Sequence, residues 1–166
     1  MAYAFKGKLI KVTTEKRRLP NGYVVNLEII KHPGAVLIVP FLNKEKIILI
    51  RQFRPVINRY LFELPAGTLA RGEKPLDCAQ REIIEETGYS ARKLTKIGEI
   101  FPVPGYSTEL ITIFKAEKLQ KQGPKMEPDE IIRIHPFTKT QIKSLCQNGK
   151  VKDAKTICAL NFCGWL

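Results

Sequence analysis

The sequence lacks the run of roughly 20 hydrophobic residues that a membrane-spanning helix needs. Its first residues do not follow the basic-then-apolar order of a secretory signal. Only four cysteines occur in 166 residues, and no two of them form a CxxC pair. This spacing disfavours a zinc site or a disulfide framework and favours buried, reduced thiols. Together these absences predict a cytoplasmic protein with no membrane partner.

Acidic residues and histidines are also scarce. The chain has 16 Asp and Glu against 28 Lys and Arg, which gives a net charge of +12. Its two histidines, His32 and His135, are isolated beside prolines, so we interpret them as structural or exposed. A basic surface attracts anions and can bind nucleic acid weakly. No RNA-binding motif or helix-turn-helix accompanies the charge, so we do not expect nucleic acid as the physiological partner.

The length suits one domain with a sizeable core, preceded by a small β extension. Residues 1–33 contain two candidate strands around Asn21-Gly22, a dipeptide typical of hairpin turns. His32-Pro33-Gly34 ends this unit. We assign residues 34–166 to the main domain, in which no internal repeat or low-complexity tract is found.

Strands and helices interleave in the main domain. Thr138 with Gln141 forms a capping box that predicts a helix, and Asp153 can cap a last helix. This order predicts an α/β (α+β) fold with a mixed sheet and helices on both faces. The predicted strands cover residues 35–41, 47–53, 61–64, 94–101, 109–116 and 131–136.

One helix is predicted in detail. Pro75 suits its first turn and Gly88 suits the position just after its end. Leu76, Ala79 and Ile83 follow at i, i+3 and i+7, which predicts an apolar stripe that packs on a sheet. The helix should therefore have one buried side, with its charged residues about a quarter-turn away.

The same helix carries three closely spaced carboxylates, Glu82, Glu85 and Glu86. Residues at i, i+3 and i+4 share one helix face, where like charges cost a few tenths of a kcal/mol per pair. Three such acids alone fit an ordinary solvated face. Their setting beside glycines and Arg81, which can orient a carboxylate, instead indicates a site for Mg²⁺ or Mn²⁺.

The whole stretch of residues 67–89 resembles the signature of the Nudix hydrolases at every fixed position. The apolar position is Ile83, and Tyr89 is a permitted variation at the last one. The resemblance implies an α/β/α sandwich and metal-dependent hydrolysis of a nucleoside diphosphate linked to another moiety. The remaining matched residues are Gly67, Glu73, Arg81, Glu82, Glu85, Glu86 and Gly88.

Three further segments resemble the ADP-ribose-hydrolysing branch of that family. Residues 51–55 match its Arg-Gln-aromatic-Arg strand end, which implies that Arg51 or Arg54 holds the substrate phosphates. Residues 63–67 lead into the signature, and the likeness implies that the backbone carbonyl of Ala66 ligates metal. Pro104-Gly105 implies a substrate contact, because Pro104 lies 15 positions after Tyr89, the spacing associated with ADP-ribose specificity.

The general base is left open between two places. The branch draws its base from an acidic loop before a late strand, which here contains Glu127 and Glu130. We favour Glu127 slightly, although Pro128 stands where an acid is common. A charged loop tip without a catalytic role is the alternative, and in that case Glu85 could serve as the base.

The N-terminal sheet resembles one that family members use to cross over and build a homodimer. A hairpin packed on its own domain is the alternative. Phe5, Tyr23 and Glu28 are candidates for contacting the substrate base.

The sequence thus predicts a hydrolase that converts ADP-ribose to AMP and ribose 5-phosphate. A related enzyme acting on GDP-mannose or another nucleotide-sugar is the nearest alternative. A non-catalytic nucleotide- or RNA-binding module is an alternative of another class, although a binding role does not require every carboxylate.

Overall fold

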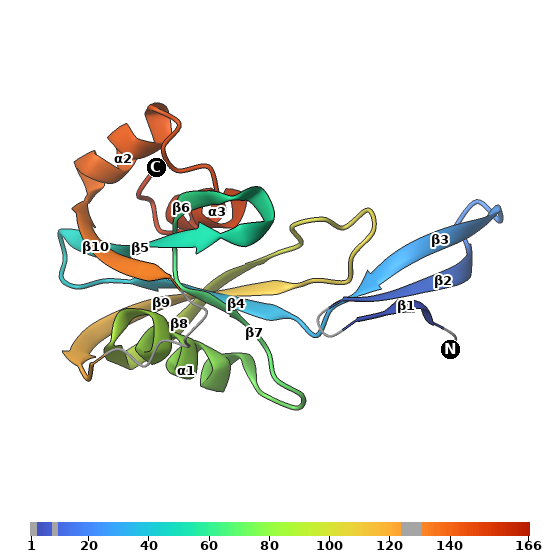
Figure 1. Ribbon diagram of the computed structural model, residues 1–166, viewed down its shortest axis with the longest axis horizontal. Coiled ribbons are helices and arrows are strands. Elements are labelled where there is room, and N and C mark those ends of the chain that lie inside the picture. The colour runs from blue at the N-terminus through green and yellow to red at the C-terminus, as the bar shows by residue number, and fades with distance from the viewer. Residues whose placement is uncertain (1–2, 8–9, 124–130) are drawn as a thin grey trace.

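The N-terminal residues form their own antiparallel sheet in the computed structural model, which describes residues 3–7, 10–123 and 131–166. Strand β1 (Tyr3–Lys6) pairs with β2 (Lys11–Arg18), and β2 pairs with β3 (Val24–Lys31). Gly22 in the turn has φ of 87°, a conformation that glycine adopts without steric cost. The hairpin prediction is confirmed, and the sheet projects away from the rest of the molecule (Figure 1, blue).

A mixed four-stranded sheet forms the centre of the main body. Its order is β7 (Ala66–Thr68), β4 (Ala35–Pro40), β9 (Ile111–Lys121) and β8 (Tyr89–Ile100). Strand β4 runs parallel to β9 and antiparallel to β7, and every residue of β4 is buried. Alternation divides its side chains between two hydrophobic clusters, because successive side chains point to opposite faces.

Helix α1 (Pro75–Thr87) covers one face of this sheet, where Ala79 and Ile83 join the cluster that contains Val36 and Ile38. A second sheet lies on the face of the central sheet opposite α1. It consists of β10 (Ile132–Thr138), β5 (Lys46–Arg54) and β6 (Arg59–Glu63). A short 3-10 helix, η1 (Pro55–Ile57), joins β5 to β6.

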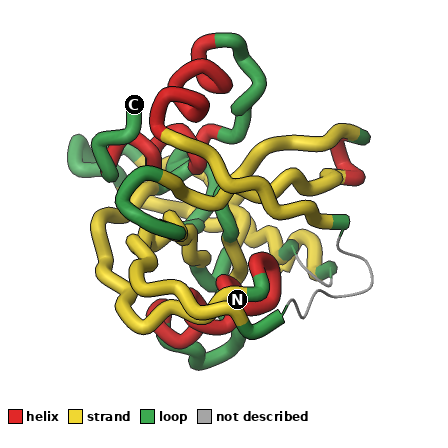
Figure 2. Tube along the Cα trace, turned by 90° about the vertical axis from the view of Figure 1, so that its left-hand side faces the viewer, coloured by secondary structure: helices red, strands yellow, loops and turns green. Residues whose placement is uncertain are grey.

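Two further helices pack on that second side, α2 (Lys139–Gln147) and α3 (Ala154–Phe162). Figures 1 and 2 show the strands lying between α1 and these helices. Thr138 and Gln141 form the predicted capping box, and Asp153 accepts the N–H of Thr156 at 3.0 Å as the cap of α3. The predicted α/β fold with a mixed sheet and helices on both faces is confirmed.

Several predictions about burial and strand limits are wrong. Leu76, the second residue of α1, is 51% exposed and does not join the buried stripe. Cys78 takes its place in the core, while Cys158 is exposed rather than buried. Strand β7 was not predicted, since three residues are too few to show a periodic pattern. Strand β8 begins at Tyr89, five residues before its predicted start.

Within the described residues, none of the helices has both the length and the apolar composition needed to span a membrane.

Candidate active site

Helix α1 carries the three acidic residues, and its two ends are set by Pro75 and Gly88. Pro75 occupies the first turn, where a missing N–H costs no hydrogen bond. Gly88 ends the helix at φ of 70° and donates its N–H to a carbonyl one turn earlier at 2.9 Å. The uninterrupted helix between them places Glu82, Glu85 and Glu86 within about one turn of each other.

Gly67 on β7 lies directly against Glu82. A Cβ atom at position 67 would overlap Oε1 and the carboxyl carbon of Glu82. Only glycine therefore allows β7 to pack on this carboxylate. This close approach explains why glycine occupies the first position of the pattern in residues 67–89.

Glu86 is fixed to the same strand. The backbone N–H of Ala66 donates to Glu86 Oε2 at 3.0 Å, and Glu86 is only 3% exposed. Glu82 is also buried, at 8% exposed. Both acids are therefore buried, because β7 covers the side of α1 that the helical pattern places about a quarter-turn from its apolar stripe. The sequence does not reveal this short strand, so it does not reveal the burial of the two acids.

Arg81 joins the carboxylates into one network. Its Nη1 donates to Glu82 Oε1 at 2.6 Å and to Glu85 Oε2 at 2.9 Å. Its Nε and Nη2 donate to the two carboxylate oxygens of Glu73 at 3.0 and 3.1 Å. Glu73 also accepts the N–H of Ala70 at 2.8 Å. The network agrees with the orienting role proposed for Arg81.

These contacts shift the ionisation of the two partners in the expected directions. Hydrogen bonds from Arg81 and from the N–H of Ala70 lower the pKa of Glu73 to about 2. The carboxylates of Glu73, Glu82 and Glu85 raise the pKa of Arg81 above its usual value. Glu73 and Arg81 are therefore both charged at neutral pH, and each holds the other in place.

The acidic edge of α1 opens into a hollow of about 310 Å³. Both arginines in its wall also pair with carboxylates outside it, Arg81 with Glu73 and Arg54 with Glu63, which Lys155 shares. The three acids of α1 thus leave an excess of negative charge in a chain that is otherwise strongly basic. The lining residues are Gln52, Arg54, Ala66, Gly67, Thr68, Arg81, Glu82, Glu85 and Glu86.

Arg54 enters this hollow from the end of β5. Its Nε and Nη2 donate to the two carboxylate oxygens of Glu63 at 2.8 and 2.7 Å, a bidentate pair. Glu63 is 1% exposed, whereas the Arg54 side chain is 39% exposed. The guanidinium is therefore held from behind and keeps an open side toward the hollow.

Several residues predicted for the site lie elsewhere in the chain. Arg51 points away from the hollow, because it neighbours Arg54 at odd spacing on β5, and its guanidinium covers the Tyr60 ring at 4.4 Å. Glu28 is exposed on β3, in the separate sheet.

Pro104 and Gly105 lie in the exposed β8–β9 loop. This loop contacts the end of β3, where the N–H of Ile30 donates to the carbonyl of Tyr106 at 2.8 Å. The structure therefore brings Pro104 and Gly105 near the N-terminal sheet and not into the acidic hollow. Their substrate role stays a prediction.

Glu127 and Glu130 lie outside the described residues. Among residues 3–7, 10–123 and 131–166, no three His, Cys, Asp or Glu side chains are arranged to hold a metal ion. Arg81 is the cation that Glu82 and Glu85 contact in this arrangement. Metal binding by these acids stays a prediction.

Sequence reasoning missed part of the wall of the hollow. Gln52 is 7% exposed, and within the described part of the chain its Oε1 has no hydrogen-bond partner. The sequence gives no signal for Glu63 beyond its place in residues 63–67, and none for Thr68. Lys155 also donates to Glu63 Oε2 at 2.6 Å, across 92 positions of sequence. No local pattern can reveal a contact of that range.

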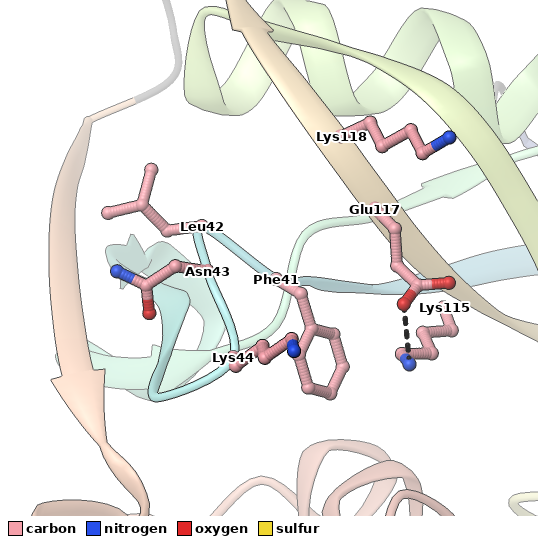
Figure 3. Close-up of a pocket in the computed structure, with 7 residues that line it drawn as sticks. All are labelled: Phe41, Leu42, Asn43, Lys44, Lys115, Glu117 and Lys118. Atoms are coloured by element: carbon pink, nitrogen blue, oxygen red, sulfur yellow. Dashed lines mark ion pairs between the residues drawn. The ribbon is translucent and has the colours of Figure 1, made fainter.

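A second hollow of about 420 Å³ has the opposite character (Figure 3). It lies between the β4–β5 turn and β9, and three lysines line it with a single acid, Glu117. Lys115 and Lys93 pair with Glu117 at 2.8 and 3.1 Å, and Lys115 Nζ also lies 4.6 Å from the centre of the Phe41 ring. One carboxylate among lysines does not suit a divalent cation, whereas the three carboxylates at the α1 edge do.

The family model described as "NUDIX domain" matches residues 31–160. The chain belongs to the Nudix family. It is 39% identical over 160 residues to the ADP-ribose pyrophosphatase of Bacillus subtilis (strain 168), covering 95% of this chain and 86% of that protein. Over the same shares of both chains it is 31% identical to the methanol dehydrogenase activator of Bacillus methanolicus.

A GDP-mannose pyrophosphatase from Citrobacter koseri (strain ATCC BAA-895 / CDC 4225-83 / SGSC4696) is 35% identical over 139 residues, which cover 78% of this chain and 72% of that protein. Among solved structures, an ADP compounds hydrolase matches with a TM-score of 0.84. That match covers 97% of this chain and 88% of the other at 23% identity, and it confirms the Nudix fold. Nudix hydrolases generally need divalent metal ions, which agrees with the acidic character of the hollow.

Proposed function

We propose that this Nudix chain hydrolyses ADP-ribose to AMP and ribose 5-phosphate with the help of Mg²⁺ or Mn²⁺. One observation carries the proposal: Glu82, Glu85 and Glu86 of α1 line one hollow together with Arg54. It occurs in a chain 39% identical, over 95% of its length, to an ADP-ribose pyrophosphatase.

The residues of the hollow fit a hard divalent cation. Carboxylate and carbonyl oxygens are the ligands that Mg²⁺ and Mn²⁺ prefer, and the hollow supplies Glu82, Glu85, Glu86 and the backbone of Ala66. The negative excess described above favours cation binding as well. When bound there, such a cation polarises phosphoryl oxygens and lowers the pKa of its water.

The chain's own residues have distinct tasks in this proposal. Arg54 binds a phosphate of the substrate through its open side, since a guanidinium presents paired donors to phosphate oxygens. Arg81 keeps Glu82 and Glu85 in fixed orientations through the bonds given above.

The reaction needs one further group, a base for the attacking water. Water adds to one phosphorus, the bridging P–O bond breaks, and the proton of the water passes to a carboxylate. Glu127 and Glu130 remain the first candidates by family resemblance. Glu85 is the candidate within the hollow, where its side chain is 32% exposed.

We also infer a homodimer formed through the N-terminal sheet, with a location in the cytoplasm. The sheet exposes large apolar side chains that a second copy could cover, including Tyr23 at 67% and Phe5 at 58% exposed. A dimer of this kind would bring Glu28 and the β8–β9 loop of one copy near another chain.

The direct test is product formation from ADP-ribose and, in parallel, from GDP-mannose. Purified protein is incubated with each substrate and Mg²⁺ or Mn²⁺, and nucleotides are quantified by liquid chromatography. We expect AMP from ADP-ribose, loss of AMP on adding a chelator, and slower cleavage of GDP-mannose. Faster cleavage of GDP-mannose would favour the function named for the Citrobacter relative. Binding of ADP-ribose without any cleavage would favour a non-catalytic module.

A further inference from the structure

The buried carboxylate of Glu63 is shared by two cations, one nearby in the sequence and one 92 positions away. Its Oε2 accepts from Arg54 Nη2 at 2.7 Å and from Lys155 Nζ at 2.6 Å. Glu63 is 1% exposed, so water does little to screen these contacts. Although burial opposes ionisation, the bonds from Arg54 and Lys155 keep the pKa of Glu63 below its usual value.

Lys155 is held in position by the first turn of α3. Its ammonium also donates to Asp153 Oδ1 at 2.7 Å, and Asp153 caps the helix through the N–H of Thr156. Thr156 in turn accepts the N–H of Leu64 at 2.8 Å, which ties α3 to the residue after Glu63. The Lys155 side chain is 21% exposed, and its position is thus fixed by both α3 and β6.

The charges alternate from the hollow to α3. Arg54, Glu63, Lys155 and Asp153 form a line of positive, negative, positive and negative groups. If Arg54 were the single partner of Glu63, the full negative charge of the carboxylate would act on that guanidinium. Its attraction for an anionic ligand would then be weaker. With Lys155 sharing the carboxylate, Arg54 keeps more of its positive charge for the hollow.

We infer that Lys155 is a positioning residue for substrate binding, because it shares Glu63 with Arg54 and leaves the guanidinium available to a phosphate of the substrate. The inference rests on the proposed function, since Arg54 is its phosphate-binding residue. The inference gives α3, which lies outside the motif of residues 67–89, a part in substrate binding.

A series at position 155 separates charge from packing. Lys155→Gln keeps a hydrogen-bond donor without the charge, whereas Lys155→Arg keeps the charge. We expect Lys155→Gln to raise KM for ADP-ribose about tenfold, as is typical of partners that orient a ligand-binding group, with kcat changed less than about twofold. Lys155→Arg should recover most of that loss. Lys152→Gln, at an exposed lysine in the same segment, is the matched control and should leave KM unchanged.

Thr156→Val tests whether anchoring of α3 alone explains the effect. It removes the bond from Leu64 and keeps every charge, so it should lower the melting temperature and raise KM much less than Lys155→Gln does. Equal KM values for wild type and Lys155→Gln would overturn the inference. A KM that rises as much in Thr156→Val as in Lys155→Gln would do the same.

A readout that needs no turnover keeps this inference separate from the proposed function. The Nε–H of Arg54 donates to Glu63 Oε1 at 2.8 Å and should give a distinct signal in ¹⁵N NMR, assigned with Arg54→Lys. We expect Lys155→Gln to shift this signal and Lys152→Gln to leave it in place. Wild-type protein that releases no AMP would contradict the proposed function alone. An Arg54 signal that does not shift in Lys155→Gln would contradict the inferred effect of Lys155 on Arg54.

Discussion

The acidic edge of α1 and the N-terminal sheet use their side chains in opposite ways. On α1, Glu82 and Glu86 are buried and each is fixed by contacts with β7 or Arg81. On the sheet, Tyr23 and Phe5 are more than half exposed. The first region is the proposed site of chemistry, and the second is the proposed surface for a second copy. Substitutions should therefore affect turnover in the first region and association in the second.

The largest effect should come from Glu86→Gln, which removes one charge and keeps the shape. We expect turnover of ADP-ribose to fall by at least about 100-fold, because a proposed metal ligand loses its charge. The melting temperature should change little. Steady-state kinetics and thermal unfolding measure the two, with Glu45→Gln at an exposed turn as the matched control. Unfolded protein, or normal turnover, would contradict the role given to Glu86.

Gly67→Ala should have the next largest effect, because the added methyl group displaces the Glu82 carboxylate. We expect kcat/KM to fall about 10- to 100-fold in protein that still folds. Gly98→Ala is the matched control, since its Cβ would meet the Phe162 ring at 2.8 Å, outside the hollow. That variant should lose thermal stability and keep its kcat/KM. If both variants lose activity equally, the steric account of Gly67 fails.

The two arginines of β5 should differ, because only one of them lines the hollow. We expect Arg54→Lys to raise KM about tenfold, since lysine cannot replace a bidentate guanidinium. Arg51→Lys should change KM by less than about threefold, because Arg51 lies on the Tyr60 ring. Substrate titrations of the two variants decide between them, and equal effects would show that the hollow does not define the phosphate site.

On the N-terminal sheet, Tyr23→Ser should weaken the proposed homodimer. Aromatic side chains at interfaces commonly contribute more than 1 kcal/mol, so we expect the dimer dissociation constant to rise about tenfold. Sedimentation at several protein concentrations measures this, with Lys16→Ser at an exposed position of β2 as the comparison. A wild-type protein that stays monomeric at high concentration would remove the proposed role of the sheet.

The smallest effect concerns pH. The pKa of Glu73 is about 2 in the folded chain against 4.5 for an unperturbed carboxyl, so the folded state favours its charged form. Its contribution to stability is complete above pH 4.5 and is lost as pH falls toward 2. The free energy lost in Glu73→Gln should thus be larger at pH 7 than at pH 3, as urea unfolding at both values can test. A loss independent of pH would assign the effect to packing.

The contrast between the two regions also shows what the sequence could predict. The limits of α1 follow from Pro75 and Gly88, and the acid spacing follows from helical geometry. The burial of Glu82 and Glu86 could not be predicted, because it depends on a strand of three residues. The pairing of Glu63 with Lys155 joins segments 92 positions apart, so neither residue shows a local signal.

Choosing between the two arginines of β5 requires knowing which face of the sheet each side chain points to. Arg51 and Arg54 read alike in the sequence, but alternation along β5 sends them to opposite sides of the sheet. Pro104 and Gly105 are predicted from family resemblance and Glu28 from its place in the N-terminal sheet, and one chain does not bring them to the hollow. Their roles stay predictions.

The most direct test of the central claim is Mn²⁺ binding, measured by electron paramagnetic resonance in wild type and Glu86→Gln with AMP present. The carboxylate edge of α1 should take up Mn²⁺ in a saturable way, and the substitution should greatly weaken that binding. Equal Mn²⁺ binding by the two proteins would contradict the assignment of the cation to α1.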